Sequence, residues 1–490
     1  MTGHQRLFYG RTLIYALLPL ILLLANGCMH PVIPPDEDIT RLEQQAKIFP
    51  DYSGITIPGN IAPLNFQVHE NGDRFVVVLE GGNGKVIRLK ERAKSFQIPP
   101  KSWSEFINEN RGSFFKIRIF KIDQGNWYEF APIINQIAPE PIDPYIVYRL
   151  IPPGYETWSF MGLFQRDLTS FRENPIIENR NIEKNCVNCH SFGNGSPENM
   201  MFHIRGSLGG TMIKKGDKIE KIDLKREETI SAGVYPAWHP SGDFIAYSTN
   251  KIEQYFYARP DHSIEVLDRH SDLIIYNTNT GEVAHVPGTK GDRFMETYPN
   301  WSPDGKYLYF SRSDARYNTP FDSIRYDIFR IAFDPVHARF GKTEPVLLLA
   351  EENLSASFPR ISPDGNFLLC TVHNYGTFPI WHREADLCLV NLKDGTFEFP
   401  GVINSDDSDS FHSWSSNSRW IIFSSRRYDG RYTKLYIAYL DEKGNFHKPF
   451  ILPAKTPEFY DDFFYSYNVP EMITEKIAVN PRKWIHHARF

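Results

Sequence analysis

The chain has 490 residues, of which 41% are hydrophobic and 14% aromatic, and a formal net charge of −5. A chain of this length can bury large cores. Because it contains no basic domain and no run of Lys and Arg, it lacks the charge pattern of a nucleic-acid-binding protein. Its aromatic residues, 32 Gly and 35 Pro favour β-structure with many turns.

The N-terminus has the pattern of an export signal. Basic residues precede an apolar run over 13–25, which is shorter than the roughly 20 residues that span a bilayer and fits the hydrophobic region of a secretory signal. The run ends in Ala25-Asn26-Gly27-Cys28, and small residues directly before a cysteine resemble a bacterial lipobox. We therefore predict a lipoprotein signal peptide over 1–27 and a lipid on Cys28. The alternative is an ordinary cleaved signal with an incidental cysteine.

Residues 28–49 begin with prolines and acidic residues, which stiffen and solvate a chain, so we predict a tether. No second hydrophobic run of spanning length follows. We therefore expect a soluble body that the lipid anchor holds at a membrane surface. The predicted location is the cell envelope, at the periplasmic or surface face of the outer membrane.

Residues 50–150 contain short strand-like runs, such as 74–79 and 114–120, separated by turns rich in Gly and Asn. Strands at this spacing indicate a sandwich or a barrel. We predict a β-sandwich-like domain. Because it carries no recognisable catalytic motif, we expect it to act as a spacer or docking module.

The most informative stretch is Cys186-Val187-Asn188-Cys189-His190. Two thiols three positions apart, followed at once by a histidine, are what covalent attachment of haem c requires. The thiols of Cys186 and Cys189 can form thioethers to the haem, and His190 can bind the iron. A thioredoxin-like pair or half of a zinc site are the alternatives, but no βαβ context and no second closely spaced pair is visible. We predict a c-type haem segment over 151–215.

Candidates for a sixth iron ligand follow this motif. A strand-like pattern over 201–205 would place Met201, His203 and Arg205 on one face. We rank His203 first, Met201 second and an open position third. Arg205 would pair with a haem propionate.

The second half of the chain contains a repeat. Its pattern is aromatic-Pro-x-Trp-Ser-Pro-Asp-Gly followed by an apolar strand, at 235–242, 298–305, 358–365 and, more loosely, 411–418. Pro-Asp-Gly forms a tight turn, whose Asp is expected to cap the turn rather than hold a metal. The pattern resembles the repeat of TolB-type β-propellers. We predict a propeller of about six blades over 216–475, then a C-terminal tail over 476–490.

Two further cysteines, Cys370 and Cys388, lie on neighbouring predicted strands. They would pair in an oxidising compartment, or serve as small buried apolar residues. Spacing alone leaves both alternatives open.

Four stretches, at 186–192, 197–210, 378–382 and 424–432, resemble a family of Bacteroidota-type lipoproteins that join a c-type haem motif to a TolB-like propeller. The resemblance implies an envelope location, one covalent haem c and a mainly β fold. That fold combines an N-terminal β-sandwich-like domain, a haem segment and the propeller. The resemblance supplies no reaction.

The leading hypothesis is a membrane-anchored monohaem cytochrome that transfers electrons to an envelope protein partner or senses redox state. A first alternative is a protein-binding scaffold in which the haem is structural. A second alternative is a haem enzyme of peroxidase-like type. For an enzyme in the propeller channel, the polar residues to inspect are His382, Arg426, Arg427, Asp429 and Tyr432, although 424–430 also reads as an exposed turn. Neither a nucleophile elbow nor a zinc-protease motif is present.

Overall fold

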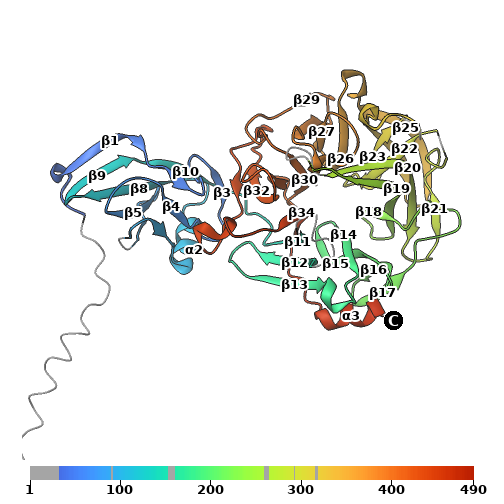
Figure 1. The fold of residues 1–490 in the computed structure, drawn as a ribbon, viewed down its shortest axis with the longest axis horizontal. Coiled ribbons are helices and arrows are strands. Elements are labelled where there is room, and N and C mark those ends of the chain that lie inside the picture. Colours follow the sequence, from blue (N-terminus) through green and yellow to red (C-terminus); the bar gives the residue numbers. More distant parts are fainter. Residues whose placement is uncertain are drawn as a thin grey trace, which may run out of the picture.

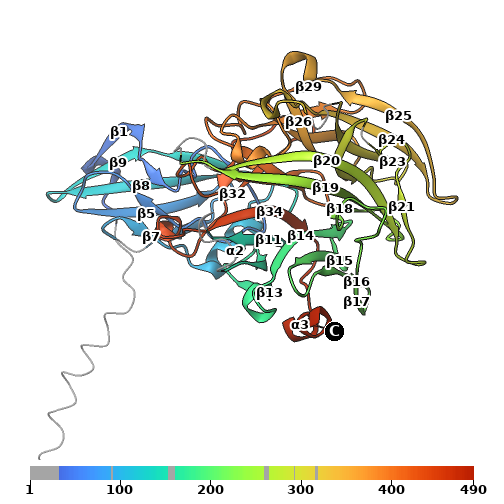
Figure 2. The same cartoon turned by 45° about the vertical axis from the view of Figure 1, so that its right-hand side comes forward.

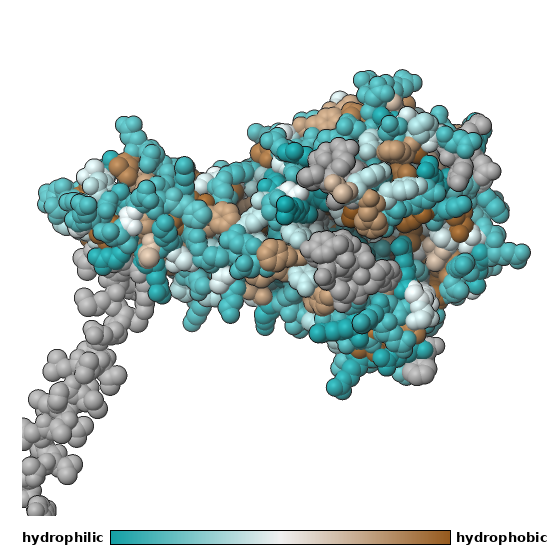
Figure 3. Space-filling view, viewed as in Figure 1, coloured by the Kyte–Doolittle hydropathy of each residue, from teal (hydrophilic) through white to brown (hydrophobic). Residues whose placement is uncertain are grey.

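The structure is a computed structural model that describes residues 33–89, 92–152, 160–258, 264–291, 293–314 and 318–489. The predicted signal peptide and Cys28 lie outside these residues. Within them, no helix is long and apolar enough to cross a membrane. Figure 3 shows a mostly hydrophilic surface with small apolar patches over both parts of the molecule.

Over the described residues, the N-terminal domain contains two sheets and one α-helix (Figure 1). The larger sheet has the order β1-β9-β8-β10-β3, and β5 and β6 extend it from β8. The smaller sheet has the order β2-β4-β7. The bounds are β1 (Ile39–Gln45), β2 (Ile48–Phe49), β3 (Thr56–Pro58), β4 (Phe66–Val68), β5 (Arg74–Gly81), β6 (Val86–Arg88), β7 (Ser95–Phe96), α2 (Pro100–Glu109), β8 (Phe114–Asp123), β9 (Asn126–Ala131) and β10 (Ile133–Ala138).

The core of this domain follows from the alternation in β8, which buries Phe115, Ile117 and Ile119 on one face of the sheet. The helix α2, which the sequence analysis did not predict, covers that face with its buried side chains. Its Trp103 ring meets the Phe115 ring edge to face, with 5.9 Å between centroids.

The propeller consists of six four-stranded antiparallel sheets in the described part of the chain, which confirms the predicted β-propeller of about six blades (Figure 1). Every blade has one inner strand next to the propeller axis, and its other three strands follow outwards in order. The blades are β34 (Ser466–Ile473), β11 (Tyr145–Ile151), β12 (Gly162–Asp167), β13 (Glu173–Glu178); β14 (Cys186–Gly193), β15 (Ser196–Arg205), β16 (Gly210–Lys215), β17 (Lys218–Ile222); β18 (Val234–Trp238), β19 (Phe244–Phe256), β20 (Ile264–Asn277), β21 (Val283–His285); β22 (Met295–Trp301), β23 (Tyr307–Ser313), β24 (Asp327–Asp334), β25 (Arg339–Leu347); β26 (Ser355–Ile361), β27 (Phe367–His373), β28 (Asp386–Asn391), β29 (Phe397–Glu398); and β30 (Asp409–Trp414), β31 (Trp420–Ser425), β32 (Lys434–Tyr439), β33 (Phe450–Ile451).

The first blade closes the ring. Its inner strand β34 comes from the C-terminal end of the chain and pairs with β11, which lies more than 300 positions earlier in the numbering. Closure of this kind joins the first and last sheets and removes exposed sheet edges inside the ring.

The structure divides the chain at other positions than the sequence analysis did. Residues 39–49 of the predicted tether contain β1 and β2 of the N-terminal domain. Residues 145–150, placed in the N-terminal domain, belong to β11 of the first blade. The predicted haem segment over 151–215 is part of the first and second blades rather than a separate unit. In the predicted tail, helix α3 (Pro481–Arg489) packs on these two blades, with the Trp484 and Phe202 ring centroids 5.0 Å apart.

The turns of the repeat have the chemistry that the sequence indicates. In the fourth blade, Ser302 donates to Asp304 over 2.6 Å, and Asp304 accepts the backbone N–H of Lys306 over 3.0 Å. Ser362 and Asp364 form the same contact in the fifth blade, also at 2.6 Å. These aspartates therefore cap turns, as predicted.

One blade carries an extended hairpin. Strands β19 and β20 continue beyond the third blade and reach across one face of the propeller (Figures 1 and 2). Glu265 on β20 accepts a hydrogen bond of 2.9 Å from Tyr375, which follows β27 of the fifth blade. The hairpin thus connects two blades that are not neighbours.

Candidate functional site

The motif Cys186 to His190 lies in β14, the inner strand of the second blade. Every inner strand contains one residue with a left-handed backbone, at a point where its pairing with the next strand shifts register. Such a bulge turns a side chain away from the regular alternation. The residues are Val469, Cys189, Tyr235, Tyr298, Phe358 and Phe411, with φ of 47°, 51°, 49°, 51°, 56° and 44°.

These equivalent positions meet in the middle of the propeller. The rings of Tyr235 and Tyr298 lie 4.4 Å apart between centroids, and those of Phe358 and Phe411 lie 5.1 Å apart. They form one cluster that Val469 also joins. The second blade therefore contributes a thiol, that of Cys189, where the next four blades contribute aromatic rings.

His190 is almost fully buried, with 3% of its surface exposed. Its Nε2 atom has no hydrogen-bond partner among the described residues. Burial and, to a smaller extent, the cation of Arg149 lower the pKa of this imidazole to about 3, although the backbone of Val147 and Val469 acts in the opposite sense. The ring is thus neutral at physiological pH, with one nitrogen able to bind a further group.

Two arginines lie beside the thiols of Cys186 and Cys189. Neither thiol is in a disulfide. Arg205 on β15 stands directly opposite Cys186 in the strand register. Arg149 on β11 donates to Asn468 over 3.1 Å, and its Nε has no partner in the part of the chain that the structure describes. Burial raises the pKa of the Cys186 thiol, and both arginines oppose that rise.

The predicted sixth ligands lie on the other side of the blade from His190. Met201 is fully buried against Trp238, between the second and third blades. His203 is on the same face by alternation, and its Nδ1 hydrogen-bonds to Thr211 over 3.1 Å. Burial, with Arg205, lowers the pKa of His203 to about 4. The contacts of His190 are instead with the backbone of the first blade.

In the described residues, two carboxyls that the sequence did not reveal, buried Asp268 and half-buried Glu471, have raised pKa values. Asp268, on the extended part of β20, accepts a hydrogen bond of 2.6 Å from Asn250. Burial raises its pKa to about 7, and it interacts electrostatically with Tyr235 and Tyr298. Burial also raises the pKa of Glu471 to about 7, against the effect of Arg360. No local sequence pattern reveals the environment of either carboxyl.

The five polar residues singled out for an enzyme do not form one site. His382 is buried, with its Nδ1 3.2 Å from Glu384, and Arg427 pairs with Asp409 over 2.6 Å. Arg426 lies over the Trp381 ring at 4.8 Å. Asp429 accepts the backbone N–H groups of Arg431 and Tyr432 over 2.7 Å each, so it caps a turn.

The residues around Cys186 have the chemistry that haem c needs. Two thiols outside any disulfide, a neutral imidazole with an unpaired nitrogen and two arginines for carboxylates occur together. Over the described residues, no group of three or more His, Cys, Asp and Glu has the geometry to hold a metal ion.

No protein-family model and no curated protein matches the chain. Solved structures of low similarity include the β-propeller domain of the Trilobed protease from Pyrococcus furiosus, at 12% identity and a TM-score of 0.34, covering 69% of this chain and 90% of that one. Prolyl oligopeptidase B from Galerina marginata has 12% identity and a TM-score of 0.35, covering 62% and 44%. A DUF4784 family protein from Bacteroides caccae has 9% identity and a TM-score of 0.31, covering 74% and 96%. The assignment of a propeller rests on the strand order described above.

Proposed function

We propose that this β-propeller protein carries one haem c, bonded to Cys186 and Cys189, with His190 as an iron ligand. The observation that carries the proposal is the buried Nε2 atom of His190, which has no hydrogen-bond partner in the described residues. His190 directly follows the second of the two cysteines in the sequence. A buried polar atom without a partner is costly unless it binds something.

Each neighbouring residue has a role in this proposal. The two cysteines anchor the group, and Arg149 and Arg205 provide charge for two propionates. The burial that keeps His190 neutral prepares its nitrogen to bind a metal. The haem would supply one-electron chemistry.

Electron transfer or redox sensing in the cell envelope is the role that we infer. The predicted lipid on Cys28 would hold the protein at a membrane, where a redox partner protein would dock. The peroxidase-like alternative requires an iron face open to small ligands, and the scaffold alternative requires that the haem stabilise the fold.

The sixth iron position discriminates among these roles. Coordination by His203 or Met201 requires β15 to repack, because both side chains face the third blade. An open position requires no such change. Spectra of the oxidised and reduced protein decide the question: low-spin six-coordinate iron supports electron transfer, and high-spin iron that binds small ligands supports the peroxidase-like role. His203→Ala and Met201→Leu then identify the ligand.

The proposal as a whole is tested on the mature protein purified from a host that makes c-type cytochromes. We expect a coloured protein whose haem remains attached on a denaturing gel, and loss of that haem in the Cys186→Ala/Cys189→Ala variant. Cys370→Ala/Cys388→Ala is the matched control and should keep the haem. A colourless wild-type protein with both thiols unmodified would refute the proposal.

A further inference from the structure

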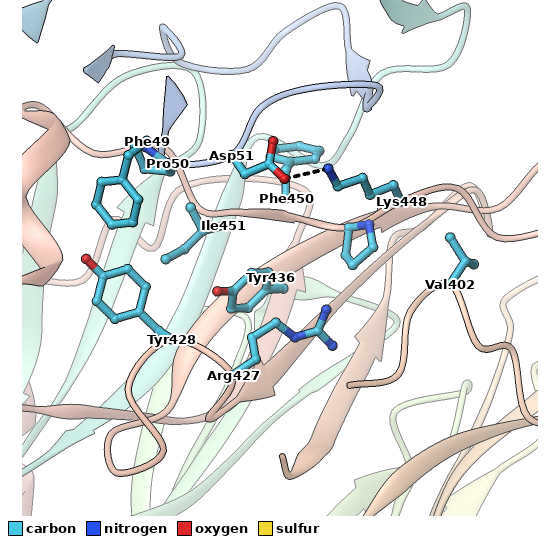
Figure 4. Close-up of a pocket in the computed structure, with 11 residues that line it drawn as sticks. Phe49, Pro50, Asp51, Val402, Arg427, Tyr428, Tyr436, Lys448, Phe450 and Ile451 are labelled. Atoms are coloured by element: carbon cyan, nitrogen blue, oxygen red, sulfur yellow. Dashed lines mark hydrogen bonds and ion pairs between the residues drawn. The ribbon is translucent and has the colours of Figure 1, made fainter. Parts of the chain in front are cut away.

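A second candidate site lies at the joint between the N-terminal domain and the sixth blade, away from the channel (Figure 4). It is a cavity of about 360 Å³, within the size range of small-molecule sites. The N-terminal domain contributes 49–51. The propeller contributes Val402, residues 427–428 after β31, Tyr436 of β32, and residues 448–451, which include β33.

Hydrogen bonds between the N-terminal part of the chain and the sixth blade hold the joint at this cavity together. Glu140 accepts a hydrogen bond of 2.8 Å from Tyr439, and Asp143 accepts one of 2.6 Å from Ser416. Thr56 and His447 approach to 2.7 Å. The two walls of the cavity therefore have a defined separation, which favours a pre-formed site.

Aromatic rings form much of the lining. The Phe49 and Tyr428 rings lie 5.8 Å apart at an angle of 48°, one from each domain. The guanidinium carbon of Arg427 stacks over the Tyr436 ring, 4.8 Å from the centroid of that ring. All three rings are half-buried, so part of each is available to a ligand.

The charges at the cavity are already paired. Lys448 contacts Asp51 over 2.7 Å (Figure 4), and Arg427 contacts Asp409 over 2.6 Å. A charged ligand would have to displace one of these carboxylates or leave a charge without a partner, at a cost in binding. A wholly apolar ligand would bury the polar edges of the lining without hydrogen bonds.

A ligand that satisfies both conditions is neutral, has hydroxyl groups for the charged side chains and has an apolar face for the rings. We propose that this cavity binds a neutral sugar of one or two units. The rings of Tyr428 and Tyr436 contact its C–H face, and Asp51, Lys448 and Arg427 hydrogen-bond to its hydroxyl groups. This site is independent of the haem and gives the joint between the domains a binding role.

The test is saturation-transfer NMR on the full mature chain with four neutral disaccharides: maltose, cellobiose, lactose and di-N-acetylchitobiose. We expect at least one to bind, and Tyr436→Ala to weaken that binding about tenfold. Asp51→Asn, at an exposed position, tests the polar contacts in case Tyr436→Ala fails to fold. Tyr255→Ala, on the extended β19, removes an exposed tyrosine that does not line the cavity and should leave binding unchanged.

Three results would overturn the proposal. The first is that none of the four disaccharides binds. The second is that a folded Tyr436→Ala variant and the Asp51→Asn variant both bind as tightly as the wild type. The third is that benzoate, a charged aromatic probe, binds at the cavity more tightly than every sugar, because the paired charges should disfavour it.

Discussion

Cys189 and Tyr235 occupy equivalent places in the inner strands of neighbouring blades, with left-handed φ angles of 51° and 49°. Each is the bulged residue that its strand turns toward the middle of the propeller. The thiol of Cys189 thus takes one aromatic position of the repeat. This equivalence explains why the thiol, the tyrosines and Asp268 interact electrostatically although they come from different blades.

The first prediction separates an electron-transfer role from a structural one. In Cys186→Ala/Cys189→Ala we expect loss of the visible spectrum but a melting temperature lowered by less than about 4 °C. The reason is that β14 is held by its ladder with β15, which does not depend on the thiols. Differential scanning calorimetry measures this. A fall several times larger would favour the scaffold alternative.

The second prediction concerns Arg149, a half-buried cation beside both thiols. A nearby positive charge disfavours the oxidised haem, so Arg149→Gln should lower the reduction potential by about 60 mV, a tenfold change for a one-electron couple. A spectroelectrochemical titration measures the shift. Arg172→Gln, whose side chain is 78% exposed in the first blade, should leave the potential unchanged.

The third prediction uses the buried carboxyl of Asp268, whose pKa is raised from 3.8 to about 7. Between these values the folded protein holds a proton that the unfolded chain has released. The contribution of Asp268 to the free energy of unfolding therefore falls as pH rises from about 4 to 7, by up to about 1.4 kcal/mol per pH unit.

Because Asp268→Asn cannot lose this proton, its stability relative to the wild type should increase across that window and level off above it. Urea unfolding at pH 5 and pH 8 gives the comparison. Asp217→Asn, at an exposed position of the same propeller, is the control. An identical pH dependence of the wild type and Asp268→Asn would contradict the prediction.

The fourth prediction concerns the C-terminal helix. Trp484 is fully buried against Phe202 of the second blade. Trp484→Ala should lower the free energy of unfolding by about 3–5 kcal/mol, as for other large buried aromatic side chains. Lys483→Ala, exposed on the same helix, should have little effect in the same denaturant titration. Equal stability of the two variants would mean that α3 does not contribute to the folded core.

Features whose chemistry is local could be predicted well. Ser302 and Asp304 lie two positions apart, and a hydrogen bond between such neighbours shapes the turn whatever surrounds it. The same holds for Asp429, whose role in a turn was one of two interpretations. The position of Met201 was harder to predict: a strand pattern places it on one face but does not say which blade that face meets.

The sequence by itself determined the propeller, because each turn and strand of the repeat is encoded within a few residues. It also determined which side chains could attach a haem, because that chemistry depends on adjacent positions. Only the tertiary structure decided that β34 completes the first blade, that Cys189 takes the place of a ring, and that Asp268 and Arg149 lie near it. Those relationships join residues dozens to hundreds of positions apart, and they arise from strand pairing and burial, which no short stretch of sequence specifies.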